Sequence, residues 1–228
     1  MSWHLIIDAD DTLWENNIYF EDAFDNFVEY LGHPELTGAD VREHLNVIEI
    51  ENAKTFGYGS VSFGRNLVEC LHQLSARAVT AKDEDAVREF AHVLLDHPMV
   101  ILPEVEETLE YLAGKYELTM FTKGSHAEQV AKVERSGLAR YFAHVEVTKE
   151  KHRAAYHGLT EMRGMERERA WMVGNSPKSD INPALEAGLN AAYVPHARTW
   201  VLEREELRAG GPGKLLVLES FAGLREHF

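Results

Sequence analysis

Residues 3–13 read WHLIIDADDTL, an apolar run that leads directly into three carboxylates and a threonine. A short apolar run bounded by polar residues is typical of a buried strand in a parallel sheet. If extended backbone continues past Ile7, Asp8 and Asp10 should point to the same side. Such closely spaced carboxylates repel one another unless a cation or a shared proton offsets their charge. The stretch therefore predicts a strand that ends in a cation-binding or acid–base site, and an acidic turn that caps a helix is the alternative.

Further strand-like runs follow at Leu118–Phe121, His144–Val147, Ala170–Val173, Ala191–Val194 and Leu215–Leu218. From Ile101 onward these runs alternate with helical stretches, which is the pattern of a parallel sheet built from strand–helix–strand units. The predicted fold class is therefore α/β, with a Rossmann-like parallel sheet. Ligands of such sheets bind at the carboxyl ends of the strands.

The stretch between the first and second predicted strands contains no convincing strand. It shows helical periodicity instead, beginning with Phe20, Phe24 and Phe27. Thr37 and Thr80 each precede an aspartate by three residues, a spacing that resembles a capping box. We therefore expect residues 1–14 and 101–228 to form an α/β core and residues 15–100 to form an inserted helical bundle.

The composition is that of an ordinary soluble globular protein, with 45% hydrophobic residues and a formal net charge of −15. This charge argues against a nucleic-acid partner, whereas a small anionic substrate needs only a local cluster of donors. No apolar run is long enough to span a membrane, and no basic leader precedes the first strand. A single cysteine, Cys70, should lie in the core. A cytoplasmic location is expected, and either a monomer or a homodimer fits.

Thr122, Lys123 and Gly124 follow the second predicted strand and precede a helix. Ser125 and Glu128 have the spacing of a capping box for that helix. A hydroxyl, a glycine and a helix N-terminus at one strand end are a source of donors for phosphate oxygens. An ordinary capped turn is the alternative interpretation of this segment.

Charged and polar residues also follow the third and fourth predicted strands. Lys149 and Lys151 come after the third strand, where a lysine would hold phosphate and offset the charge of Asp8; a solvated turn is the alternative. Asn175 and Asp180 come after the fourth strand and add the oxygen ligands that magnesium prefers. A helix cap is the alternative interpretation of Asp180, and a metal ligand is favoured over it.

In chain order, these four segments resemble the motifs of the haloacid dehalogenase-like (HAD) superfamily: Asp-x-Asp-x-Thr, Thr, Lys and Gly-x-Ser-(x)3-Asp. The resemblance covers the chain outside the helical insertion. It implies that Asp8 is the nucleophile, that Asp10 is the general acid and base, and that Thr122 donates to phosphate. It also implies a Mg²⁺ cofactor, with Asp8, Asn175, Asp180 and the backbone carbonyl of Asp10 as its ligands.

The resemblance also favours Lys151 over Lys149 as the family lysine, because Lys151 lies five residues before Tyr156. Lys149 remains an alternative. Lys123 replaces a common asparagine and would alter phosphate contacts, and Asn175 replaces a frequent aspartate and would weaken magnesium binding. The helical insertion resembles a cap that closes over the site and selects substrates.

Asp10 separates two reactions of this superfamily, since dehalogenase relatives replace the second aspartate of the first motif. We therefore predict a magnesium-dependent phosphohydrolase that acts on a small phosphorylated metabolite through an aspartyl-phosphate on Asp8. For the first step Asp10 should hold a proton well above the usual pKa of about 3.9, a shift that the negative charges of Asp8 and of the phosphate favour. The alternatives are a catalytically silent ligand-binding protein of the same fold, a HAD hydrolase that is not a phosphatase, and a receiver domain. The histidines show no metal-ligand spacing, so zinc is not expected.

Overall fold

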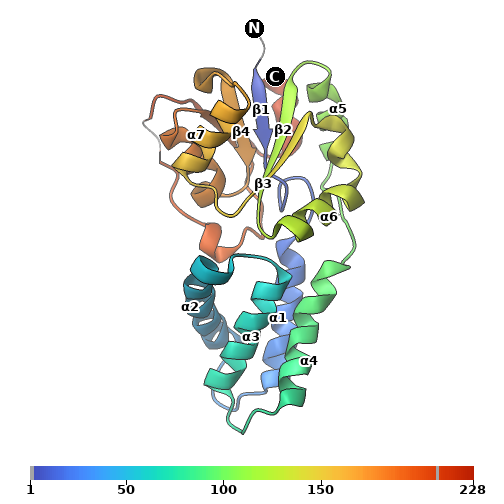
Figure 1. Cartoon of the computed structure of the whole chain (residues 1–228), viewed down its shortest axis with the longest axis vertical. Helices are drawn as coiled ribbons and strands as arrows, with labels where there is room; N and C mark the ends of the chain where they lie inside the picture. The colour runs from blue at the N-terminus through green and yellow to red at the C-terminus, as the bar shows by residue number, and fades with distance from the viewer. Residues whose placement is uncertain (1–2, 209–210) are drawn as a thin grey trace. The chain divides into compact units, whose positions relative to one another are not determined.

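The computed structural model describes residues 3–208 and 211–228. The chain divides into two compact units, one of Met1–Glu15 with Met99–Phe228 and the other of Asn16–Pro98. The first unit is an α/β domain, and the second is helical (Figure 1). Each unit has its own apolar core.

The α/β unit contains a six-stranded sheet with the order β3-β2-β1-β4-β5-β6, in which every neighbouring pair is parallel. Its strands are β1 (His4–Ile7), β2 (Glu117–Lys123), β3 (His144–Thr148), β4 (Ala170–Gly174), β5 (Asn190–Tyr193) and β6 (Leu215–Val217). The predicted Rossmann-like parallel sheet is confirmed. Because β1 lies between β2 and β4, the residues that follow it are flanked by the ends of both neighbours.

Both faces of the sheet are covered, which explains why the central strands β1 and β4 are apolar without alternation. Leu5 and Ile7 of β1 pack in a cluster with α5 (Val105–Ala113) and α6 (His126–Ser136), whereas Ile6 packs with α7 (Arg153–Met162) and α8 (Asn182–Glu186). Figure 1 shows α5 and α6 on one side of the sheet and α7 on the other. Short helical segments complete the unit. The 3₁₀-helices are η2 (Leu138–Tyr141), η3 (Arg167–Arg169), η5 (Val201–Glu203) and η6 (Phe221–Glu226), and η4 (Pro177–Ile181) is π-helical.

The helical unit is built from α1 (Asn17–Leu31), α2 (Gly38–Phe56), α3 (Ser60–Leu74), α4 (Ala81–His92) and the turn η1 (Val93–Leu95). One apolar stripe of each helix enters a common core, as the periodicity predicts. Capping boxes begin α2 at Thr37 and α4 at Thr80, as predicted. Cys70 is buried in this core, also as predicted. The capping box predicted for α6 is wrong, because the side chain of Ser125 makes no capping hydrogen bond.

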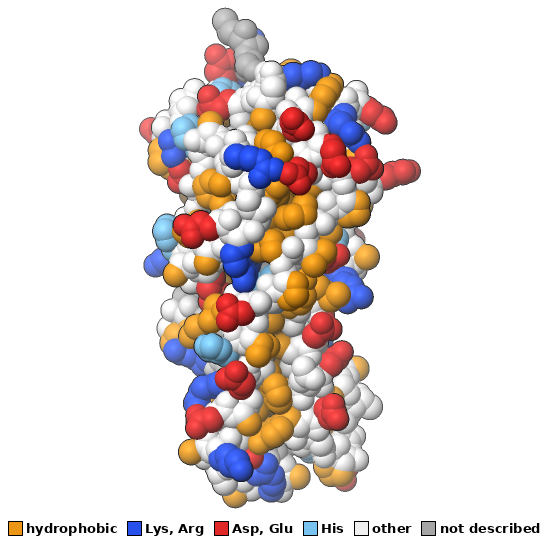
Figure 2. Space-filling view, turned by 90° about the vertical axis from the view of Figure 1, so that its right-hand side faces the viewer, with side chains coloured by type: hydrophobic (Ala, Val, Ile, Leu, Met, Phe, Trp, Pro, Cys, Tyr) orange, Lys and Arg blue, Asp and Glu red, His pale blue; other side chains and the backbone are white. Residues whose placement is uncertain are grey.

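The surface carries charges of both signs. On the face drawn in Figure 2, acidic and basic side chains are interspersed with hydrophobic ones. Among the helices of the described residues, none has the length and apolar character needed to cross a membrane.

Glu49 of α2 is a buried carboxyl group in the core region of the helical unit. Its side chain is 6% exposed, and its Oε2 has no hydrogen-bond partner among the described residues. Burial raises the pKa of Glu49 from 4.5 to about 7, although the charge of Arg42 opposes the shift. Folding therefore binds a proton at this position, and the associated stability is lost as the pH rises from 4.5 through 7.

We expect Glu49→Gln to raise the free energy of unfolding at pH 8 by up to about 3 kcal/mol, because glutamine removes the buried charge. Most of this gain should disappear at pH 5, where Glu49 is already protonated in the folded state. Urea denaturation at the two pH values measures the difference, with Glu51→Gln on the exposed side of α2 as the control. An equal effect of Glu49→Gln at pH 5 and pH 8 would contradict the raised pKa.

Candidate active site

The acidic stretch begins where β1 ends. Ile7 is in register with Met120 of β2 and Val173 of β4, and the backbone N–H of Asp8 donates to the carbonyl of Val173 at 2.9 Å. The chain then turns, because Asp11 has a φ of +59° and the N–H groups of the next two residues both donate to the carbonyl of Ala9. The extended geometry therefore ends near Asp8, so alternation along the strand does not determine where the Asp10 side chain points.

One lysine joins two carboxylates from different strand ends. Lys151 Nζ lies 2.5 Å from Asp8 Oδ1 and 2.8 Å from Asp180 Oδ1, and it donates hydrogen bonds to both. The exposed fractions of Asp8, Lys151 and Asp180 are 7%, 3% and 1%. Lys149, the alternative lysine, is exposed. Tyr156 donates to the backbone carbonyl of Ser179 at 2.8 Å and so ties the helix after Lys151 to η4.

This buried group holds two carboxylates and one ammonium, so it carries one excess negative charge when all three are ionised. Burial raises the pKa of Asp180 to about 7, the charge of Asp8 adds to the shift, and Lys151 opposes it. Burial lowers the pKa of Lys151, but the charges of Asp180 and Asp8 outweigh burial and raise it. A divalent cation would offset the excess negative charge.

The oxygen atoms around Asp8 and Asp180 fit a hard divalent cation. Thr12 Oγ1 lies 3.0 Å from Asp8 Oδ2 and 3.3 Å from Asn175 Oδ1. The side-chain oxygen of Asn175 therefore points toward the Asp8 carboxylate. The Asn175 amide donates to Thr199 Oγ1 at 3.0 Å, which fixes this orientation. A Cβ at position 174 would lie 2.3 Å from Asp180 Oδ2, so only glycine leaves room for that carboxylate. Two carboxylates and an amide oxygen are ligands that magnesium accepts.

The carboxylate of Asp10 belongs to a different group of side chains. Its two oxygens accept hydrogen bonds from Trp14 Nε1 at 2.8 Å, Gln129 Nε2 at 2.9 Å and Lys132 Nζ at 3.0 and 2.9 Å. Burial raises the pKa of Asp10, but the charge of Lys132 and these hydrogen bonds outweigh burial and lower it. This lowered pKa belongs to the protein without phosphate, whereas the raised pKa was expected for the first step with phosphate bound. The lowering depends on Lys132 of α6, which is far from Asp10 in the sequence.

Thr122 lies at the end of β2, beside Asp10. Its buried hydroxyl accepts a hydrogen bond from Gln129 Nε2 at 2.9 Å, and the same nitrogen donates to Asp10. The hydroxyl proton of Thr122 remains available for an acceptor such as a phosphate oxygen. Gly124 has a φ of +149°, and a Cβ there would lie 3.1 Å from Gln129 Nε2. Glycine thus serves both the backbone conformation and the close approach of the glutamine.

The comparisons with known proteins identify the family. A family model, described as a haloacid dehalogenase-like hydrolase, matches residues 4–188. This chain belongs to the haloacid dehalogenase-like hydrolases. No curated protein matched it.

Three solved structures illustrate the range of similar proteins. A haloacid dehalogenase-like family hydrolase from Xanthomonas campestris is 29% identical with a TM-score of 0.85, over 99% of this chain and 90% of that one. A 2-haloacid dehalogenase from Pseudomonas syringae pv. Tomato DC3000 is 23% identical with a TM-score of 0.64, over 99% and 97%. A predicted phosphoglycolate phosphatase from Haemophilus somnus 129pt is 16% identical with a TM-score of 0.68, over 99% and 97%. The last two show the fold alone, and their names describe different reactions.

In this HAD-like hydrolase, Lys123 is held in a network apart from Asp8. Its Nζ donates to Glu203 Oε1 at 2.6 Å and to Ser179 Oγ at 3.0 Å. Ser176 Oγ donates to the other Glu203 oxygen at 2.6 Å. Burial raises the pKa of Glu203, but Lys123 and the hydrogen bonds outweigh burial and lower it. The sequence offered no signal for Glu203, because it lies in a turn without a motif or a periodic pattern.

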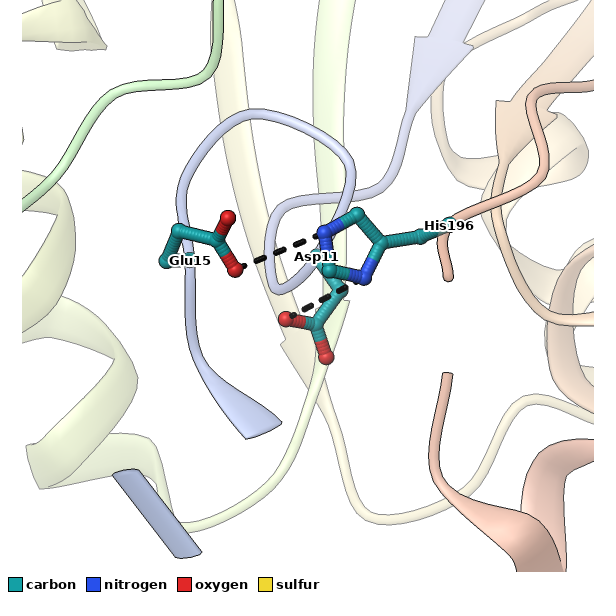
Figure 3. A group of neighbouring side chains, drawn as sticks. All are labelled: Asp11, Glu15 and His196. Carbon is teal, nitrogen blue, oxygen red and sulfur yellow. Dashed lines mark ion pairs between the residues drawn. The ribbon is translucent and has the colours of Figure 1, made fainter. Parts of the chain in front are cut away.

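A second group of ionisable side chains lies at Asp11, Glu15 and His196 (Figure 3). One potential ligand atom from each lies within 4.8 Å of the others. The imidazole is between the two carboxylates, with Nδ1 at 3.9 Å from Asp11 and Nε2 at 3.4 Å from Glu15. Nδ1 also accepts the backbone N–H of Arg198 at 3.3 Å. The two ring nitrogens of this HAD-like hydrolase thus face different carboxylates.

Proposed function

We propose that this HAD-like hydrolase is a magnesium-dependent phosphohydrolase that cleaves a small phosphorylated metabolite through an aspartyl-phosphate on Asp8. The observation that carries the proposal is the buried contact of Lys151 with both Asp8 and Asp180 at the end of β1. The family includes hydrolases with different substrates, and the intact carboxylate at Asp10 favours phosphate ester cleavage over dehalogenation.

In the first step an Asp8 carboxylate oxygen forms a bond to phosphorus, and the bond from phosphorus to the leaving oxygen breaks. Thr12 and Lys151 hold the Asp8 carboxylate in one orientation, and the lysine charge reduces its repulsion from the anionic phosphate. Thr122 donates its hydroxyl proton to a phosphate oxygen. Asp8, Asn175, Asp180 and the backbone carbonyl of Asp10 would hold Mg²⁺, which would supply further positive charge at the phosphate.

Asp10 handles the protons in both steps. A bound phosphate dianion raises the pKa of a neighbouring carboxyl group, which favours the acid form that protonates the leaving oxygen. Ionised Asp10 then takes a proton from the water that attacks the aspartyl-phosphate, and Asp8 is released. The free protein already holds Asp10 in the ionised form that the second step requires.

The helical unit is proposed as the cap that selects the substrate, because its sequence follows directly after the acidic stretch. A small phosphorylated metabolite as partner and a cytoplasmic location complete the proposal. The second candidate function is a catalytically silent ligand-binding protein. It is favoured by Asn175 in a position where relatives carry aspartate, and by the four hydrogen bonds that already hold Asp10.

We expect the protein to release phosphate from at least one member of a panel of phosphorylated metabolites when Mg²⁺ is present. Chelation with EDTA should lower the rate on the order of 100-fold, because the metal offsets charge in the transition state, and added Mg²⁺ should restore it. A parallel panel of 2-haloacids measures halide release. Halide release without phosphate release would overturn the proposal, and tight phosphate binding without turnover or trapping of a metal fluoride would favour the silent protein.

A further inference from the structure

Helix α6 brings two buried polar side chains to Asp10. Gln129 and Lys132 are three residues apart, so they lie on the same side of the helix. Their exposed fractions are 3% and 9%, and the polar end of each contacts the Asp10 carboxylate. Neither residue lies in one of the sequence motifs described above.

The contacts fix the orientation of the Asp10 carboxylate. Lys132 Nζ bridges both oxygens at 3.0 and 2.9 Å, Trp14 holds Oδ1, and Gln129 holds Oδ2. The terminal torsion of an aspartate side chain is otherwise broad, so an unheld carboxylate samples many orientations. Proton transfer requires the oxygen to be within hydrogen-bond reach of its partner. Bonds to both oxygens therefore restrict Asp10 to one plane.

Gln129 also contacts both Asp10 and Thr122, the residue proposed to bind phosphate. Its Nε2 lies 2.9 Å from Asp10 Oδ2, 2.9 Å from Thr122 Oγ1 and 2.7 Å from the carbonyl oxygen of Lys123, and its two protons are shared among these three acceptors. One amide nitrogen thus sets the separation of the acid–base oxygen and the phosphate-binding hydroxyl. Gly124 leaves the room that this arrangement needs.

Packing alone does not account for a charged side chain at position 132. A buried ion pair costs the desolvation of two charges, and well-packed apolar residues of similar volume are often as stabilising or more so. A methionine would fill the same space without that cost. The ion pair therefore points to the orientation of Asp10 rather than to stability.

We propose that Lys132, assisted by Gln129, is a positioning residue that orients the Asp10 carboxylate for proton transfer to the leaving oxygen. This inference rests on the proposed phosphohydrolase function. It predicts that loss of Lys132 lowers kcat/KM by a larger factor for some substrates than for others. The larger factor is expected where the leaving group must be protonated, and the smaller one where it departs as a stable anion.

The test compares two substrates, an alkyl phosphate and p-nitrophenyl phosphate. The quantity measured is kcat/KM, because it reports the steps up to departure of the leaving group. Lys132→Met should lower kcat/KM for the alkyl phosphate on the order of 100-fold and for p-nitrophenyl phosphate less than about 10-fold. Lys132→Arg keeps the charge and should recover part of the loss. Lys214→Met removes an exposed lysine of the same unit and serves as the matched control.

Equal losses on both esters, or an unchanged rate on the alkyl phosphate, would overturn the positioning role. If Lys132→Met does not fold, Gln129→Met replaces it and should show the same dependence on the leaving group. A wild-type protein that hydrolyses neither ester nor any member of the metabolite panel would instead contradict the proposed function. The two failures are therefore distinguishable.

Discussion

Asp8→Asn should abolish phosphate release, with a loss in kcat on the order of 10⁴-fold or more, as expected when a covalent nucleophile is removed. The asparagine amide is nearly the same size as the carboxylate, and its oxygen can still accept from Lys151, so the fold should survive. What it lacks is the anionic oxygen that bonds to phosphorus. Steady-state phosphate release with the best panel substrate gives the comparison.

Asp11→Asn is the matched control for this experiment, since Asp11 lies in the same stretch and is buried but faces His196. Its rate should stay within a few-fold of the wild type. Mass spectrometry of acid-quenched wild-type protein should detect a phosphoryl group on the peptide that contains Asp8. If Asp8→Asn keeps more than a few per cent of the activity, Asp8 is not the nucleophile.

Lys151→Met should have the largest effect on stability, because it leaves two buried carboxylates facing each other without a cation. Removal of one partner from a buried ion pair typically costs about 3–5 kcal/mol. The loss should depend on pH: burial and Asp8 already raise the pKa of Asp180 from 3.8 to about 7, and removal of Lys151 raises it further. Stability tied to protonated Asp180 is lost as the pH rises through that value, so the deficit should be larger at pH 8 than at pH 5.

Urea denaturation without added metal, at pH 5 and pH 8, measures this deficit. The double variant Lys151→Met/Asp180→Asn should recover much of the stability at pH 8, because only Asp8 then remains charged. It should not recover activity, since both residues belong to the proposed site. A deficit below about 1 kcal/mol at pH 8 would show that the Asp8–Lys151–Asp180 group does not depend on the lysine charge.

The parts of the candidate site that lie beside strand ends were predictable from the sequence. Asp8, Thr122 and Asp180 each follow an apolar run, and a parallel sheet brings the ends of its strands to one edge. Lys151 was preferred over Lys149 from its spacing to Tyr156, and the structure buries Lys151 against Asp8 and leaves Lys149 exposed.

The side chain of Lys123 was harder to place. Its strand end suggested phosphate binding, but its amine pairs with Glu203, which lies in a turn beyond β5. The lowered pKa of Asp10 in the protein without phosphate was not indicated by the local sequence, which shows acidic neighbours and no cation. The decisive charge comes from Lys132, and no local pattern connects α6 with residue 10.

By itself, the sequence determined the α/β class, the positions of its strands, the helical character of the inserted stretch and the concentration of acidic residues after β1. These features depend on short-range periodicity and on the common edge of parallel strands. Only the tertiary structure decided which cation faces each carboxylate: Lys151 faces Asp8 and Asp180, Lys132 faces Asp10, and Lys123 faces Glu203. A lysine ammonium lies at the end of a long flexible side chain, so its partner depends on how elements far apart in the sequence pack.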